Sequence, residues 1–103
     1  MDRIEKLNNF LAQTPNDCFL NHALALEYIK LGIEEEAKKC FEKNLLNDAN
    51  YLATYYHLGK LLERNQQEKE AMKLYEQGMA VAKKAGDMHS YSELQSAFEE
   101  IAY

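Results

Sequence analysis

The chain has 103 residues, of which 47% are apolar and 28% are charged, and this composition is ordinary for a soluble globular protein. Its net charge of −5 argues against nucleic acid and against an anionic membrane surface, because binding to phosphate groups needs a basic face. No apolar run approaches the roughly 20 residues that span a bilayer. The first residues also lack the basic-then-apolar order of a signal peptide, so we expect a cytoplasmic protein.

Four glycines and one proline leave little room for loops, so the chain is expected to be almost entirely helical. Asp2 to Gln13 reads as an amphipathic helix, because apolar residues recur there at helical spacing. These residues are Ile4, Leu7, Phe10 and Leu11. Pro15 ends this helix, and Asn16 or Asp17 can cap the next one by accepting from its free backbone N–H groups.

The second helix is predicted from about Asp17 to Leu31, and Gly32 then supplies a left-handed C-cap. Glu34, Glu35 and Glu36 fall in the first turn of a third helix, where the helix dipole favours acidic side chains. This third helix is expected to continue to about Leu46.

Asn47 to Asn50 repeats the stop-and-restart signal, and a fourth helix is predicted from about Tyr51 to Arg64. Asn65 is the expected turn residue, since asparagine tolerates left-handed backbone better than most residues. A fifth helix is predicted from about Gln67 to Lys84, followed by a C-cap at Gly86 and an N-cap at Asp87. The last helix is predicted over Met88 to Ala102, with an apolar stripe and an otherwise polar surface.

The second and third helices and the fourth and fifth helices are two copies of one pattern, offset by 34 residues. Six pairs of positions are identical, namely Leu24/Leu58, Glu34/Glu68, Glu36/Glu70, Ala37/Ala71, Lys39/Lys73 and Glu42/Glu76. Three more pairs are similar in size or character, namely Ala25/Gly59, Phe41/Tyr75 and Leu45/Met79.

A helix–turn–helix unit with this period resembles the tetratricopeptide repeat family. The resemblance covers essentially the whole chain and implies an all-α fold, an α-solenoid of antiparallel helix hairpins in a single domain, 1–103. Two full repeats, 18–51 and 52–85, lie between an opening half-repeat helix, 2–13, and a capping helix, 87–102. The terminal helices are expected to cover the ends of the stack.

The resemblance also implies which residues pack the repeats together. The small residues Ala25, Gly59, Ala37 and Ala71 would allow close approach of the paired helices, and Phe41 and Tyr75 would fill the space between neighbours. Two positions depart from the family pattern. Asn21 stands where a large aromatic residue is usual, as at Tyr55 in the second repeat, and Ala49 replaces the usual proline.

Members of this family bind other proteins, and the first helices of successive repeats line the binding groove. The residues expected to line it here are Phe19, His22, Leu26, Ile29, Tyr56, His57, Lys60 and His89. Phe19, Leu26 and Tyr56 would supply the affinity for a peptide or helix of a partner, and Lys60 would favour an acidic residue in the ligand. The lysine–asparagine clamp with which one subfamily grips chaperone tails is absent. Its positions are occupied by His22, Leu26, His57, His89 and Glu93.

Two alternatives to partner binding remain open. The chain could be a self-assembling subunit, a homodimer that fills its own groove, or, more remotely, a metal-binding protein that uses its three histidines. No glycine-rich phosphate loop, nucleophile elbow or HExxH motif appears, so we expect neither an enzyme nor a cofactor. The two cysteines, Cys18 and Cys40, fit no metal-ligand spacing and are expected to be free thiols.

Overall fold

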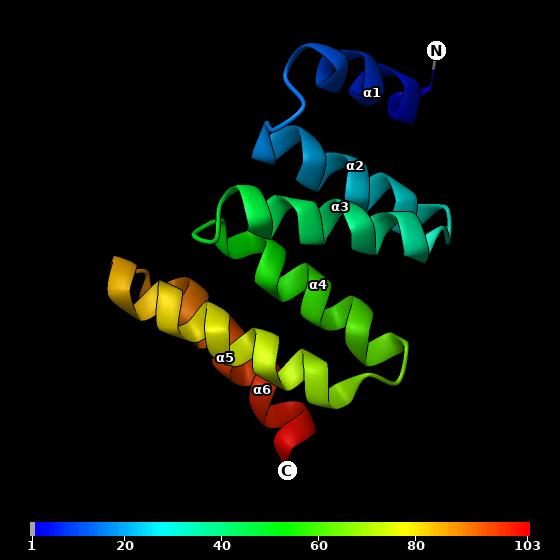
Figure 1. The fold of residues 1–103 in the computed structure, drawn as a ribbon. Helices are drawn as coiled ribbons and strands as arrows, with labels where there is room; N and C mark the ends of the chain where they lie inside the picture. Colours follow the sequence, from blue (N-terminus) through cyan, green and yellow to red (C-terminus); the bar gives the residue numbers. More distant parts are fainter. Residues whose placement is uncertain (1) are drawn as a thin grey trace. The chain divides into compact units, whose positions relative to one another are not determined.

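A computed structural model describes residues 2–103, and within that range it contains six helices and no strand (Figure 1). The helices are α1 (Arg3–Gln13), α2 (Cys18–Lys30), α3 (Glu34–Asn47), α4 (Leu52–Arg64), α5 (Glu68–Ala85) and α6 (Met88–Ala102). The sequence-based prediction of the helices is confirmed, since every predicted end lies within one residue of the observed end.

The chain folds into two compact units, with the division between Tyr51 and Leu52. Unit 1 contains α1, α2 and α3, and unit 2 contains α4, α5 and α6. The division falls at the predicted boundary between the two full repeats. Each unit is described separately below.

Helix caps at the expected residues set where α2 and α6 begin. The Oδ1 atom of Asp17 accepts from the backbone N–H of Leu20 at 2.9 Å, and Oδ1 of Asp87 accepts from the N–H of Ser90 at 3.0 Å. Each bond satisfies one of the donors that a helix N-terminus leaves free. The predicted caps at Asp17 and Asp87 are therefore confirmed.

The turns after α2 and α4 have their left-handed residue at equivalent positions of the two repeats. Gly32 and Gly86 have φ of 75°, the left-handed conformation that glycine adopts without steric cost. The prediction of Asn65 as the left-handed residue after α4 is wrong, because that residue is Gln66, with φ of 65°. The N–H of Asn65 still donates to the carbonyl of Leu61, so the helical pattern extends one residue further before the chain reverses.

The core of unit 1 lies between α2 and α3. Ala25 of α2 and Ala37 and Phe41 of α3 are completely buried, as the resemblance implied. From α1 only Leu7 reaches this core as a buried residue, whereas Phe10, which was expected on the same apolar stripe, is exposed. Cys18 and Cys40 are both partly exposed free thiols.

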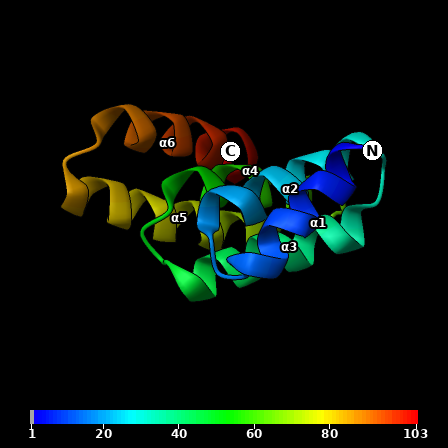
Figure 2. The ribbon, with the colours of Figure 1, turned by 90° about the horizontal axis from the view of Figure 1, so that it is seen from above.

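The core of unit 2 involves all three of its helices. Gly59 of α4 lies against the ring of Tyr75 of α5, and Ala71 and Tyr75 are completely buried. The capping helix α6 lies alongside α5, as the two views in Figures 1 and 2 show, and contributes the buried residues Leu94 and Ala97. The residues that the resemblance assigned to close packing in this unit are therefore confirmed as core residues.

Candidate partner-binding site

The predicted binding residues of unit 1 differ in their accessibility. Phe19 of α2 is 69% exposed, which is unusual for a phenylalanine side chain, while Leu26 and Ile29 are half-buried. These three side chains can therefore contact a partner to different extents.

His22 is buried, and this corrects the expectation that it lines an exposed surface. Its imidazole packs between two aromatic rings, at 5.4 Å from the ring centroid of Phe41 and 5.6 Å from that of Tyr51. Aromatic pairs at these distances stabilise a protein core. His22 is thus part of the packing of unit 1.

In unit 2, a cleft of about 230 Å³ lies between α4 and α6. Tyr56 and Lys60 of α4 line one side. The whole lining consists of Tyr56, Lys60, Glu93, Ser96, Ala97 and Glu100. Two turns of α6 therefore face one turn of α4 across a space that is open to a ligand.

The two other predicted residues of unit 2 lie beside this cleft. His57 is half-buried, and its ring stands edge-on to that of Tyr56 with 5.6 Å between the centroids. Burial lowers the pKa of His57, and the negative charge of Glu93 only partly opposes this effect. His89 is exposed, and its Nε2 lies 3.8 Å from Oε2 of Glu93.

Lys60 is held by carboxylates within unit 2. Its Nζ lies 3.6 Å from Oε2 of Glu63 and 3.5 Å from Oε2 of Glu100, and it also stands 5.6 Å from the centre of the Tyr56 ring. The lysine charge is therefore already balanced. This does not support the expectation that Lys60 favours an acidic residue in a ligand.

A buried tyrosine fixes the position of one of these carboxylates. The hydroxyl of Tyr75 donates to Oε2 of Glu63, which in turn faces Lys60. Burial, the hydrogen bond to Glu63 and the nearby negative charge all raise the pKa of the Tyr75 phenol. Tyr75 therefore stays protonated and remains a donor, and the chain of contacts links the core of unit 2 to the edge of the cleft.

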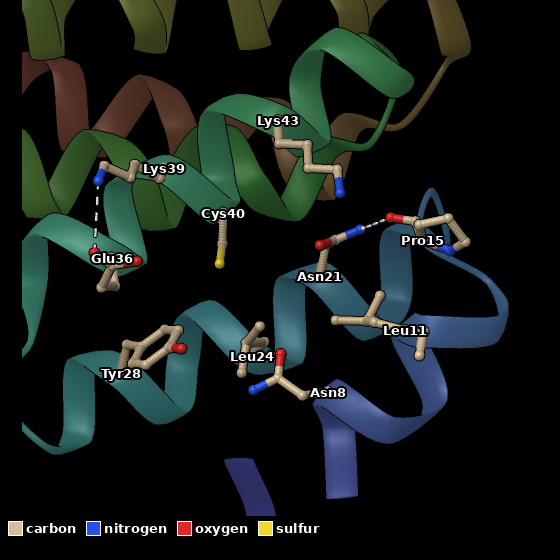
Figure 3. A pocket seen from close by; sticks show the side chains of 11 residues that line it. Asn8, Leu11, Pro15, Asn21, Leu24, Tyr28, Glu36, Lys39, Cys40 and Lys43 are labelled. Carbon is tan, nitrogen blue, oxygen red and sulfur yellow. Dashed lines mark hydrogen bonds and ion pairs between the residues drawn. The ribbon is translucent and has the colours of Figure 1, made fainter. Parts of the chain in front are cut away.

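Unit 1 contains a larger pocket that the sequence analysis did not predict (Figure 3). It has a volume of about 410 Å³ and lies between α1 and the hairpin of α2 and α3. Its lining consists of Asn8, Leu11, Ala12, Pro15, Asn21, Leu24, Tyr28, Glu36, Lys39, Cys40 and Lys43. None of the predicted binding residues is among them.

Asn21, which stands where the family usually has a large aromatic residue, lines this pocket. Its Nδ2 donates to the carbonyls of Pro15 and Asp17, both at 3.0 Å, and so ties the start of α2 to the preceding turn (Figure 3). The repeat aligns Asn21 with Tyr55, which is a buried aromatic residue in unit 2. The smaller side chain of Asn21 was thus a signal for extra space in unit 1.

Two further observations bear on the kind of site. Among the described residues, no group of three histidine, cysteine, aspartate or glutamate side chains is placed to hold a metal ion. No helix formed by residues 2–103 is both long enough and apolar enough to cross a membrane.

Comparison with known families identifies the repeats. The model of the tetratricopeptide repeat matches residues 20–51 and 52–84 in succession, which is more than half of the chain. The chain belongs to the tetratricopeptide repeat family. The resemblance seen in the sequence is thereby confirmed, as is the all-α fold of tetratricopeptide type.

Several solved structures share this fold. A tetratricopeptide repeat domain protein from Salinibacter ruber is 40% identical, with 84% of this chain and 96% of that chain covered and a TM-score of 0.79. A Bordetella parapertussis protein is 26% identical over 99% of this chain and 89% of its own, with a TM-score of 0.84. The structure of MamA, at 15% identity and a TM-score of 0.69 over 96% of this chain and 64% of that one, shows the fold alone. No curated protein matches the chain.

Membership of the family defines the general class of activity. Tetratricopeptide repeats generally act as protein–protein interaction modules, and proteins of this family are typically non-enzymatic scaffolds.

Proposed function

We propose that this tetratricopeptide repeat protein binds a segment of another protein, and that the α4–α6 cleft of unit 2 forms the contact surface. The observation that carries the proposal is the position of Tyr56 and Lys60 opposite Ser96 and Glu100, with Ala97 at the base. Ala97 is almost completely buried, whereas Tyr56 is only half-buried, so the cleft combines a closed base with an accessible aromatic ring. Tyrosine is enriched among the residues that contribute most to protein interfaces.

The size of the cleft supports a side chain of a partner as its occupant. Pockets for small molecules and cofactors usually measure about 300–1,000 Å³. The cleft, at about 230 Å³, is smaller than this range and suits one inserted side chain of a peptide or helix. We also place the protein in the cytoplasm, because its two free thiols fit a reducing compartment.

The decisive experiment compares Tyr56→Ala with the wild-type protein in affinity capture from the native lysate, read by mass spectrometry. Leu46→Ala is the matched control, since Leu46 is 88% exposed and lines neither of the cavities described above. We expect a protein that wild type and Leu46→Ala both retain to be lost with Tyr56→Ala.

Tyr56→Ala should also keep a melting temperature near that of wild type, because the side chain is only half-buried. Retention of the same proteins by a folded Tyr56→Ala variant would show that the cleft is not the contact surface. A large loss of stability would instead show that Tyr56 belongs to the core.

One observation favours self-assembly as a second candidate. Phe19 is exposed and Leu26 and Ile29 of the same helix are half-buried, and an apolar patch that continues over several exposed side chains often marks an interface. A homodimer that buries Phe19 would persist in light scattering at low micromolar concentration and would dissociate in Phe19→Ala. A monomeric wild-type protein under those conditions would exclude this candidate.

A further inference from the structure

We infer that the α4–α6 cleft accepts a lysine or arginine side chain from a basic segment of the partner protein. This inference rests on the proposed function and specifies the chemistry of the ligand. It opposes the simpler reading of the sequence, in which the positive charge of Lys60 selects an acidic ligand.

The charges around the cleft are predominantly negative. Glu93 and Glu100 line it from α6, and Glu63 lies against the only lysine of its lining, Lys60. Three carboxylates against one ammonium group leave a formal charge of −2 at this site. The whole α6 sequence contains three glutamates and no lysine or arginine, so α6 brings no compensating charge.

His57 adds little positive charge to the cleft near neutral pH. Burial lowers the pKa of His57, which favours the neutral imidazole. His89 of α6 lies 3.8 Å from Glu93 and carries a positive charge only when its imidazole is protonated. The Glu93 side chain is 56% exposed, so its carboxylate can be reached by a cation of a ligand.

The shape and polarity of the cleft match a long basic side chain. The ring of Tyr56 and the buried Ala97 give an apolar surface for the methylene stem, which lysine and arginine commonly bury while the charged head stays near water. The ring face also attracts cations, as the position of Lys60 at 5.6 Å from its centre shows. At the rim, the Glu93 and Glu100 side chains are 56% and 68% exposed and can accept from an ammonium or guanidinium group.

An acidic ligand would be repelled by the carboxylates of the cleft. Its carboxylate would approach Glu93 and Glu100, and placing like charges together at an interface strongly disfavours a wrong partner. The net charge of −5 on the chain would in addition slow its approach and would attract a basic segment.

The test uses two short synthetic peptides as probes. Both share the same leucine and alanine positions, and the remaining positions are all lysine in one peptide and all glutamate in its twin. Backbone NMR spectra of the full chain would be recorded during titration with each. We expect the lysine peptide to shift the amide resonances of Tyr56, Ser96 and Ala97, and the glutamate peptide to leave them unchanged.

Charge variants of α6 make the test specific. Glu93→Gln/Glu100→Gln should weaken binding of the lysine peptide by about five- to tenfold, since two solvent-exposed ion pairs with the ligand are lost. Glu99→Gln is the control: Glu99 is exposed on the same helix and does not line the cleft, and its substitution removes one negative charge where the double variant removes two. Its effect should stay below about twofold.

Lys60→Met gives an independent check with the opposite sign. Removal of this ammonium group frees Glu100 and leaves the negative charge of Glu63 unbalanced, so the lysine peptide should bind about threefold more tightly. Weaker binding by Lys60→Met would overturn the inference, because Lys60 would then contact the ligand directly.

The remaining outcomes separate the inference from the proposed function. If the glutamate peptide shifts the cleft resonances as strongly, the inference fails while the cleft remains a binding surface. Equal losses in Glu99→Gln and in the double variant would show a diffuse attraction and overturn the inference. If neither peptide shifts these resonances, the inference fails, and the capture experiment with Tyr56→Ala still decides the proposed function.

Discussion

Gly59→Ala is the most direct test of the packing in unit 2. A Cβ atom at this position would lie 2.1 Å from Cε1, 2.6 Å from Cζ and 2.8 Å from Cδ1 of Tyr75. Carbon atoms pack best at about 3.5–4.0 Å, so the ring would have to move by more than an ångström. Tyr75 is completely buried and its hydroxyl is bonded to Glu63, and both facts restrict that movement.

The magnitude follows from two opposing effects. Overpacking a well-filled core costs typically about 1–3 kcal/mol, and the severe contact with Tyr75 places this case near about 3 kcal/mol. Replacement of glycine by alanine within a helix returns about 1 kcal/mol. We therefore expect a net loss of about 2 kcal/mol in the free energy of unfolding and a fall in melting temperature of about 10 °C. Urea denaturation followed by circular dichroism measures the first quantity, and a thermal scan measures the second.

The repeat supplies a matched control for this substitution. Ala25 occupies the position equivalent to Gly59 in the first repeat, where it is completely buried and lies in the same core as Phe41. Ala25→Gly should cost about 1 kcal/mol through helix propensity and about 0.8 kcal/mol through the loss of the buried methyl group. In unit 2, the double variant Gly59→Ala/Tyr75→Leu should be more stable than the sum of its single changes predicts, by at least about 1 kcal/mol. Additive effects, or a Gly59→Ala variant as stable as wild type, would refute the role assigned to the Tyr75 ring.

Three further predictions concern ionisation and capping. The phenol of Tyr75 should stay protonated above pH 10 in absorbance titrations of the folded chain, because its pKa is raised in the folded state. As pH rises through the ordinary pKa of 10, the unfolded chain releases this proton before the folded chain does, so the free energy of unfolding should fall. Tyr75→Phe should remove this contribution. Ionisation of all seven tyrosines together in the folded chain would contradict the prediction. For His57 the pKa is lowered, so its imidazole should titrate below 6.5 by NMR. As pH falls from about 7 to about 5, the unfolded state therefore binds this proton before the folded state does, and the free energy of unfolding falls. His57→Gln should lose less of this free energy over the same interval than the wild-type protein does. An equal loss would contradict the prediction. Asp17→Ala should lose about 1 kcal/mol in urea denaturation through the missing bond to the N–H of Leu20, whereas Asp17→Ser should retain most of it, and equal losses would exclude a capping effect.

The helices of this protein could be predicted well from sequence because local chemistry determines their ends. Asp17 and Asp87 each supply an acceptor three residues before a free N–H, and Gly32 and Gly86 supply left-handed backbone. The buried positions Ala37 and Ala71 could be predicted from the repeat, because two copies of one pattern identify the face that packs.

Residue preference alone predicts the wrong left-handed residue after α4, because the register of the repeat determines this position. Asparagine tolerates left-handed backbone, which favoured Asn65, but Gln66 is the residue equivalent to Gly32 in the repeat. The hydrogen bonds agree with that register. The N–H of Ile33 donates to Tyr28 and the N–H of Gln67 donates to Leu62, both at 2.9 Å, so the two turns close in the same way. The geometry of the repeat therefore outweighs the cost of placing glutamine at positive φ.

The binding surface was harder to predict, because it depends on contacts between side chains that lie far apart in the sequence. Helical periodicity placed His22 on the same surface as Phe19, but it could not show that the rings of Phe41 and Tyr51 cover the imidazole. The sequence likewise showed a lysine at position 60 but could not show that carboxylates balance its charge. Glu63 is a neighbour on the same helix, but Glu100 reaches Lys60 only because α6 lies beside α4. With α6 packed beside α4, three carboxylates lie around one ammonium group, and for this reason we propose basic rather than acidic ligands for the cleft.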